Sequence, residues 1–413
     1  INAFYTDHHS KDHGARVTAW SEAQEVLFQE NPEDVDAGAF YALSILATAP
    51  KEDKTFSNQK KAGEILERML KEYPEHPGLF HYTIHAYDNP ALAERAVPVA
   101  RGYDKLAPEV PHALHMPSHI FVRLGIWPDT IDWNIRSANA AKEQSGEVIS
   151  LHYSHAADYL IYAYLQQGKD KKASEVIAVL DSAHNYQDSF ASAYALAAAN
   201  ARYALERADW QGSAALSAPS DTGFDWEKYP QYEAISHYAR GVGAARSGDI
   251  GTAKHAKAKL DKLYEQTAAN GEEYWAVIVD AQRKTVAAWI EYTDGDKEKG
   301  IMMMKDAADV EDSVDKHPVT PGAVMPARDM YADMLILSDK PAEALVAYEA
   351  SLQISPNRFY SLYGAGYAAE QAGNTEKAIE YYSKPVELAS ESDSKRERVD
   401  NAKKYLSEND SKS

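Results

Sequence analysis

Apolar positions along this chain recur every three or four residues and almost never at alternate positions. Ala, Leu and Tyr recur at this spacing, with Glu and Lys between them, over segments of roughly 12 to 20 residues. This is the periodicity of amphipathic helices. Turn-forming pairs such as Gly-Asp, Gly-Asn, Asn-Pro and Ser-Pro separate the segments. The pattern therefore predicts an all-α protein made of many short helices.

The clearest internal repeat lies near the C-terminus. Ala344, Tyr348 and Pro356 have the Ala-x3-Phe and Pro spacing that ends the second helix of a tetratricopeptide (TPR) repeat. The next unit echoes the pattern at Gly364, Tyr367, Gly373, Ala378 and Tyr382. Partial matches recur upstream, at Leu124 and Gly125, at Gly168 and Ala173, and at Gly241, Gly248 and Ala253.

Small residues suit the places where the two helices of a hairpin cross closely, and stacked hairpins bury one continuous core. We therefore expect a TPR-like α-α superhelical solenoid of about ten helical hairpins. Gly241, Ala344 and Gly364 are expected at close helix crossings.

Three stretches interrupt or end this pattern of helical repeats. Residues 212–231 have no helical period, so they predict a linker between an N-terminal half, 1–211, and a C-terminal half, 232–413. Residues 315–326 contain three prolines and a glycine, which predicts a loop laid over a groove. The charged tail, 391–413, predicts a capping helix.

Composition narrows the partners and the compartment. The 413 residues are 45% hydrophobic and carry a formal net charge of −20, which opposes binding to nucleic acid. No apolar run is long enough to predict insertion into a membrane. The chain has no cysteine, so any metal must be held by histidine and carboxylate. It begins at Ile1 without a signal-like segment, as expected for a trimmed product that works in the periplasm or outside the cell.

Eight of the 15 histidines lie between residues 76 and 155, and most share a helix face with a neighbour. Side chains three or four residues apart point the same way on a helix. The aligned pairs are His81 with His85, His115 with His119, and His152 with His155. Pro117 makes the geometry of the middle pair uncertain, because it removes a backbone donor and can kink a helix or begin one.

The three pairs are separated by about one repeat length, roughly 34 to 40 residues, so stacking of the hairpins predicts that they converge on one concave surface. Imidazole ligands with few carboxylates favour zinc or copper, less so iron. Further ligand candidates are His112, Asp88, Asp158 and His317.

The remaining polar candidates have simpler interpretations. His76 is expected to cap a helix, and Asn357 and Arg358 are better explained by helix capping than by carboxylate binding. Solvent-exposed positions are expected for His8, His9, His13, His184, His237 and His255.

Two long strings of the sequence carry a resemblance to a known family. The chain contains HPGLFHYTIH from His76 and HALHMPSHIFVRLGIW from His112. They resemble a family of bacterial TPR-repeat proteins with the motifs HPGxxHYxIH and HALHMPSHIFxRLGxW, and the similarity extends over most of the chain. The resemblance implies a helical repeat fold and a histidine-rich site, without implying an activity. It also implies a further helical repeat region upstream of Ile1.

Two classes of function fit these features. The first is a TPR-type scaffold that binds protein or peptide partners, or copies of itself, at a surface containing a His-bound metal. The alternative is a metal-dependent hydrolase or oxidoreductase, with zinc, copper or iron held by histidines and with Asp88, Tyr82 or Tyr159 assisting. The sequence alone leaves both open.

Overall fold

The structure is a computed structural model that describes residues 1–50, 53–217 and 224–409. It divides into two compact units, Ile1–Leu124 and Gly125–Ser413. Part of the predicted linker, residues 218–223, lies outside the described residues, and the two predicted halves stay a prediction. The described residues contain no strand, and one isolated bridge joins Ile149 to Tyr186. No helix in these ranges has the length and apolar character needed to cross a membrane.

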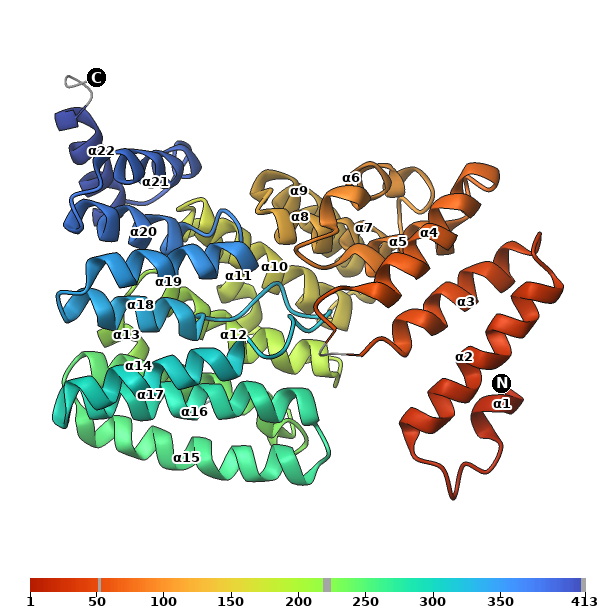
Figure 1. The fold of residues 1–413 in the computed structure, drawn as a ribbon, viewed down its shortest axis with the longest axis horizontal. Helices are drawn as coiled ribbons and strands as arrows, with labels where there is room; N and C mark the ends of the chain where they lie inside the picture. Colours follow the sequence, from red (N-terminus) through yellow and green to blue (C-terminus); the bar gives the residue numbers. More distant parts are fainter. Residues whose placement is uncertain (51–52, 218–223, 410–413) are drawn as a thin grey trace. The chain divides into compact units, whose positions relative to one another are not determined.

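The first unit consists of antiparallel helical hairpins followed by shorter helices (Figure 1). Its elements are α1 (Asn2–Tyr5), α2 (His13–Glu30), α3 (Val35–Ala47), α4 (Ser57–Glu72), α5 (Pro77–Tyr87), α6 (Ala93–Gly102), η1 (Tyr103–Lys105), α7 (Pro111–His115) and α8 (Pro117–Leu124). Successive helices from α2 to α6 pack on one another, and α8 packs on both α5 and α6. The last four short elements therefore bring the histidine motifs beside α5.

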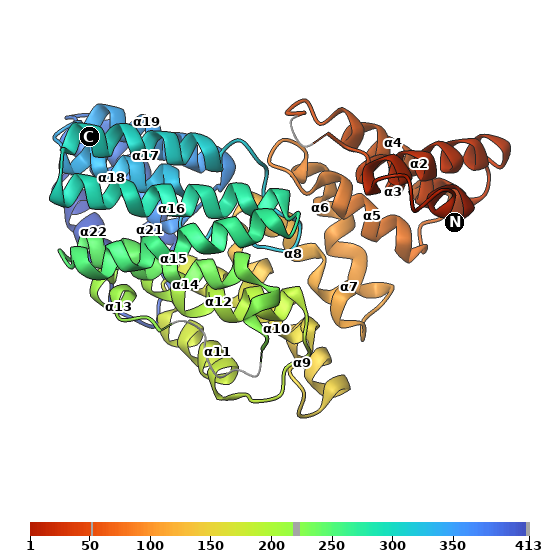
Figure 2. The ribbon, with the colours of Figure 1, turned by 90° about the horizontal axis from the view of Figure 1, so that it is seen from below.

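The second unit is a longer array of the same kind. Its elements are α9 (Trp127–Ser145), α10 (Leu151–Gln166), α11 (Asp170–Ser182), α12 (Phe190–Glu206), α13 (Trp210–Ala214), η2 (Trp226–Lys228), α14 (Pro230–Arg246), α15 (Ile250–Ala269), α16 (Glu273–Asp294), α17 (Lys297–Glu311), α18 (Ala327–Leu337), α19 (Pro341–Ile354), α20 (Phe359–Gln371), α21 (Thr375–Leu388) and α22 (Glu397–Asn409). Neighbouring helices such as α14, α15 and α16 lie side by side (Figure 2). The protein is thus an all-α, TPR-like solenoid of helical hairpins, as predicted.

The predicted close crossings are confirmed. A Cβ atom on Gly364 would lie 2.4 Å from the Tyr348 ring, and one on Gly241 would lie 2.8 Å from Val286. Ala344 is fully buried. Gly373 has a φ of +73° in the turn between α20 and α21, a conformation that glycine adopts without strain. Gly241, Ala344 and Gly364 therefore have the packing roles predicted for them.

The proline-rich segment is a loop, as predicted, and it lies against two helices of the second unit. No helix forms between Glu311 and Ala327. Arg202 on α12 donates to the carbonyl oxygen of Ala323, and the Tyr238 hydroxyl on α14 donates to that of Met325. The predicted capping helix is α22, and residues 410–413 of the tail lie outside the described residues.

Candidate metal centre

The first histidine pair lies on α5. His81 and His85 are four residues apart, and their Nε2 atoms are 3.1 Å from each other. The helix begins with His76 as its N-cap and Pro77 as its first residue, an arrangement that fixes where α5 starts. The predicted shared face is therefore present, and both rings are only partly exposed.

The second pair lies on two consecutive short helices. His115 ends α7, and Pro117 begins α8, where a missing N–H costs no helix hydrogen bond. Met116 between them keeps right-handed helical dihedrals, φ −51° and ψ −40°, so the four-residue spacing still aligns the side chains. The Nε2 atoms of His115 and His119 are 3.0 Å apart, and both residues are buried. The proline thus restarts the helix without separating the pair.

The fold of the first unit brings these pairs together. The ring centroids of His81 and His112 are 5.1 Å apart, and those of His85 and His119 are 6.0 Å apart. Five imidazoles, from α5, α7 and α8, therefore form one cluster. We call this group the histidine cluster; its members are His81, His85, His112, His115 and His119.

Asp88 and Arg123 fix the orientation of one imidazole in the cluster. The Nδ1 atom of His119 lies 3.1 Å from Asp88 Oδ2, and Arg123 Nε donates to Asp88 Oδ1 at 2.7 Å. Arg123 Nη2 also donates to the backbone oxygen of Asp88. A carboxylate only accepts hydrogen bonds, so the proton of His119 is on Nδ1. Its Nε2 atom consequently carries a lone pair that faces His115.

The surroundings of His81 favour its neutral form. Burial and the neighbouring imidazoles of His85, His112 and His119 lower the pKa of His81 to about 3. A neutral imidazole is the form that binds a metal ion. His81 is therefore in the ligand-competent protonation state at neutral pH.

The nitrogen spacing is close to that of two ligands on one metal ion. Zn–N bonds of about 2.0 to 2.1 Å at a tetrahedral angle place two nitrogens about 3.3 Å apart. The 3.0 and 3.1 Å separations in the cluster need a shift of only a few tenths of an ångström. A carboxylate on the far nitrogen of a ligating histidine is also a common feature of metal sites. The donor set of the first unit fits a first-row metal.

The third predicted pair belongs to the second unit. His152 and His155 lie on α10, where His155 is buried against Tyr159 with ring centroids 5.3 Å apart, and burial lowers the pKa of His152. Asp158 on the same helix is 3.5 Å from Arg202, while burial raises its pKa to about 6. The convergence of this pair with the histidine cluster stays a prediction.

His317 also has contacts within the second unit. Its ring packs against Tyr274 and Trp275, with centroid separations of 5.2 and 5.1 Å. Its Nδ1 atom accepts the N–H of Val319 at 3.2 Å. These contacts give His317 a packing role in the loop, and its role as a ligand stays a prediction.

The structure tests the simpler interpretations of the histidines. Exposed positions are confirmed for His8, His9, His13, His184 and His255. The prediction for His76 is confirmed, because its side chain accepts the N–H of Leu79 at the start of α5. The prediction for His237 is wrong, because this residue is buried on α14, with Glu233 3.5 Å from its Nε2 atom. Helix α14 is enclosed by packing on neighbouring hairpins, so even its polar positions lose solvent contact.

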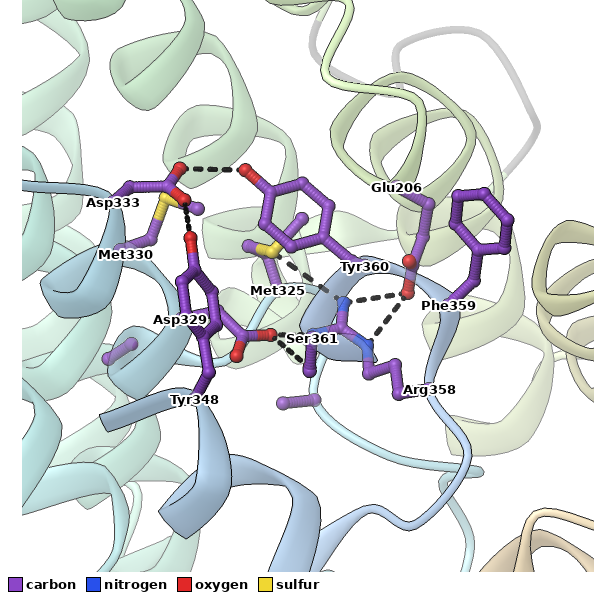
Figure 3. A network of polar contacts seen from close by, with 12 residues as sticks. Glu206, Met325, Asp329, Met330, Asp333, Tyr348, Arg358, Phe359, Tyr360 and Ser361 are labelled. Atoms are coloured by element: carbon purple, nitrogen blue, oxygen red, sulfur yellow. Dashed lines mark hydrogen bonds and ion pairs between the residues drawn. The ribbon is translucent and has the colours of Figure 1, made fainter. Parts of the chain in front are cut away.

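Sequence reasoning missed Arg123 and misassigned Arg358. Arg123 is four residues after His119, so the same spacing rule that found the histidines also places it on their face of α8. Arg358 makes no side-chain capping bond at α20. Figure 3 shows it between Glu206 and Asp329, with its Nη2 atom 2.7 Å from Glu206 Oε1. It does bind carboxylates, but they belong to the protein itself.

Comparisons with known proteins find only distant structural similarities. No protein-family model matches the chain, and no curated protein matches it significantly. Among solved structures, a human IFIT1 dimer with PPP-AAAA is 13% identical, with a TM-score of 0.42, and covers 94% of this chain and 82% of that one. The P58(IPK) TPR domain is 14% identical, with a TM-score of 0.27, and covers 91% of this chain and 99% of that one. Naa15/Naa10 bound to HypK-THB is 14% identical, with a TM-score of 0.30, and covers 99% of this chain and 66% of that one.

These similarities are too distant to transfer a ligand. They do not test the expectation that this chain does not bind nucleic acid. That expectation rests on net charge alone and stays a prediction.

Proposed function

We propose that the protein is a TPR-type binding scaffold whose first unit holds a transition metal in the histidine cluster. The observation that carries this proposal is the buried His115–His119 pair, with its Nε2 atoms 3.0 Å apart and His119 oriented by Asp88. Zinc or copper suits these nitrogen ligands best, and iron is a weaker match. His81 and His85 would supply further nitrogens, and His112 lies beside them.

The scaffold part of the proposal follows from the fold. Stacked hairpins present an extended surface to protein or peptide partners, and the exposed end of a solenoid can stack on another copy. A metal bound among α5, α7 and α8 would stabilise that surface, because a ligand that binds only the folded state adds to its stability. The periplasmic or extracellular location, the bacterial family and the metalloenzyme alternative remain predictions from the sequence.

Metal binding can be tested with untagged full-length protein. Elemental analysis of the purified chain should find zinc or copper, and calorimetric titration of chelator-treated protein should give one saturable site for Zn²⁺. A chelator should lower the melting temperature at neutral pH. The double variant His115→Ala/His119→Ala should lose both the binding and the chelator effect.

A matched control comes from exposed histidines in the same unit. His8→Ala/His9→Ala removes two adjacent rings that lie in solvent, and it should bind Zn²⁺ like the unaltered chain. Failure of untagged protein to bind Zn²⁺ or Cu²⁺, or equal loss of binding in both double variants, would show that the cluster is only a packing seam.

A further inference from the structure

The second unit contains a pocket that none of the histidines lines. Its volume is about 190 Å³, and its walls come from α14, α18, α19, α20 and α22. A buried water needs about 10 to 15 Å³ by such a measure, so the space suits a molecule of several heavy atoms. Ile336, Leu337, Tyr363 and Tyr367 form its apolar and aromatic side.

One charged pair in the pocket wall is already satisfied. Asp333 forms an ion pair with Arg246 and accepts the hydroxyls of Tyr348 and Tyr360, the latter at 2.7 Å. Figure 3 shows both tyrosines directed at this carboxylate. Burial by itself would raise the pKa of Asp333, but Arg246 and the two hydroxyls hold it below its ordinary value. Asp333 and Arg246 therefore cancel each other's charge.

The guanidinium of Arg246 also packs against two tryptophan rings. Its guanidinium carbon lies 3.8 Å from the ring centroid of Trp210 and 4.3 Å from that of Trp289. Two aromatic faces and a carboxylate leave this arginine little freedom to turn toward a ligand. It serves as a fixed part of the wall.

Arg398 is the second arginine of the pocket, and Asp333, the carboxylate whose charge acts on it, is already paired with Arg246. Its guanidinium carbon lies 4.1 Å from the Tyr360 centroid and 5.3 Å from the Tyr363 centroid. Tyr360 provides a side-chain hydrogen bond to Arg398, but no residue of 1–50, 53–217 or 224–409 forms an ion pair with it, and its buried Nη1 atom has no hydrogen-bond partner. A buried charged donor without an acceptor costs free energy, so this atom marks a place where an anion would be stabilising.

We propose that this pocket binds the carboxylate of a small organic acid, with Arg398 donating to the carboxylate and Leu337, Tyr363 and Tyr367 contacting the apolar part. The pocket has one excess positive charge on a chain of net charge −20, so it is a local attractor for a monoanion. A planar guanidinium also matches a carboxylate in geometry. The doubly charged form of phosphate would require more positive charge than the pocket offers.

Calorimetric titration of the full chain can test this with two acids and their uncharged amides. Phenylacetate represents a free organic acid, and N-acetyl-leucine represents the C-terminus of a peptide; phenylacetamide and N-acetyl-leucinamide lack the charge. At least one acid should bind about tenfold or more tightly than its amide. The acid that binds identifies the source of the carboxylate. Equal binding of acid and amide, no binding of either acid, or tighter binding of inorganic phosphate than of both acids would overturn the proposal.

Two variants locate the site, each with a matched control. Arg398→Gln should weaken binding of the acid about tenfold or more, while Lys403→Gln, an exposed charge on the same helix, should not. Should Arg398→Gln not fold, Leu337→Glu decides, because Leu337 is 57% exposed at the pocket and tolerates substitution. The added negative charge should abolish binding, and Val346→Glu at a 64% exposed position outside the pocket should not. Unchanged affinity in both pocket variants would also overturn the proposal.

Discussion

The two units bury polar groups of different kinds. In the first unit the polar interior is dominated by imidazoles, with one arginine, Arg123, holding Asp88. The second unit also buries His155 and His237, but arginine–carboxylate pairs predominate there. The pairs are Arg202 with Asp158, Arg246 with Asp333, Arg358 with Glu206 and Asp329, and Arg396 with Asp170. The same type of helical repeat therefore buries mainly imidazoles in one unit and mainly arginine–carboxylate pairs in the other.

The difference matters because the two kinds respond differently to their surroundings. Arginine stays protonated, so its pairs are permanent and removal of one partner leaves a buried charge. A neutral imidazole keeps a lone pair that can bind a metal ion or accept a proton. We infer that the interior of the second unit mainly fixes structure, while that of the first can exchange a ligand.

The largest expected effect comes from breaking a permanent pair. Arg358→Ala leaves Glu206 and Asp329 buried without a counter-charge, and it should destabilise the second unit by about 3 to 5 kcal/mol. His115→Ala in metal-free protein removes a neutral ring and should cost only about 1 to 2 kcal/mol. Urea unfolding followed by far-ultraviolet circular dichroism measures both losses, because both units consist of helices.

A surface arginine in the same unit provides the control. Arg283 pairs with Asp261 and Asp280 at a position still 28% exposed, so Arg283→Ala should cost less than about 1 kcal/mol. Equal losses for Arg358→Ala and His115→Ala would remove the contrast between the two interiors.

The second-largest expected effect tests a glycine–tyrosine packing contact that both units contain. Gly63 on α4 faces the Tyr87 ring at 2.3 Å from its would-be Cβ, and Gly364 on α20 faces the Tyr348 ring at 2.4 Å. Each tyrosine hydroxyl is bound to a carboxylate, Glu67 or Asp333, so neither ring can move aside freely. Gly63→Ala and Gly364→Ala should each destabilise their own unit by about 1 to 3 kcal/mol.

Hydrogen exchange measured by mass spectrometry separates the two glycine variants, because faster exchange should appear only in the unit that carries the substitution. Gly251→Ala is the control: its Cβ would meet only Asp249, at an ordinary 3.6 Å. If only one of the two variants lost stability, the glycine–tyrosine contact would not stabilise the two units equally.

The predictable features of this protein are those set by local spacing. Ala344, Gly364 and the histidine pairs follow from periods of three and four residues, and the backbone of α7 and α8 preserves that period across Pro117. Helix identity and the alignment of histidines three or four residues apart therefore follow from sequence alone.

The features that escaped prediction depend on contacts distant in sequence. Arg358 meets Glu206 across 152 residues, and no periodicity links them. Burial of His237 depends on the hairpins packed around α14, so its exposure could not be judged from its own helix. The compact units also divide at Leu124 and Gly125, where the sequence shows only a partial repeat match and no long irregular segment. Compactness is a property of packing, and packing combines elements far apart in the chain.

A smaller effect concerns Glu311, a carboxyl of the second unit that is not paired with an arginine. Glu311 forms no ion pair with any described residue; its Oε2 atom accepts the N–H of Ala327 at 2.7 Å, and burial raises its pKa to about 8 from 4.5. The folded state thus keeps a proton that the unfolded state loses, and stability falls as pH rises from about 4.5 to about 8. Glu311→Gln keeps the acceptor oxygen but cannot lose a proton, so it should remove most of this decline.

The test measures the melting temperatures of the unaltered chain and of Glu311→Gln from pH 5 to pH 9. Glu343→Gln, at an exposed position on α19, should keep the decline of the unaltered chain. Parallel curves for the unaltered chain and Glu311→Gln would mean that this carboxyl is ionised in the folded protein like the arginine-paired ones.

The smallest effect tests whether Asp88 orients a ligand or only fills space. Asp88→Asn keeps the shape, but its amide N–H2 can turn toward His119 Nδ1 and shift the ring proton to Nε2, the atom proposed to bind metal. Zn²⁺ affinity measured by calorimetry should fall about tenfold to a hundredfold, with little change in the far-ultraviolet circular dichroism. Asp36→Asn alters an exposed carboxylate 3.2 Å from His76 in the same unit and should leave the affinity unchanged. Because both substitutions remove one negative charge near a histidine, a general electrostatic effect would weaken both, whereas control of the His119 tautomer weakens only Asp88→Asn. An Asp88→Asn protein that binds Zn²⁺ as tightly as the unaltered chain would reduce Asp88 to a partner of Arg123, and the first unit would then differ from the second only in the type of residue that it buries.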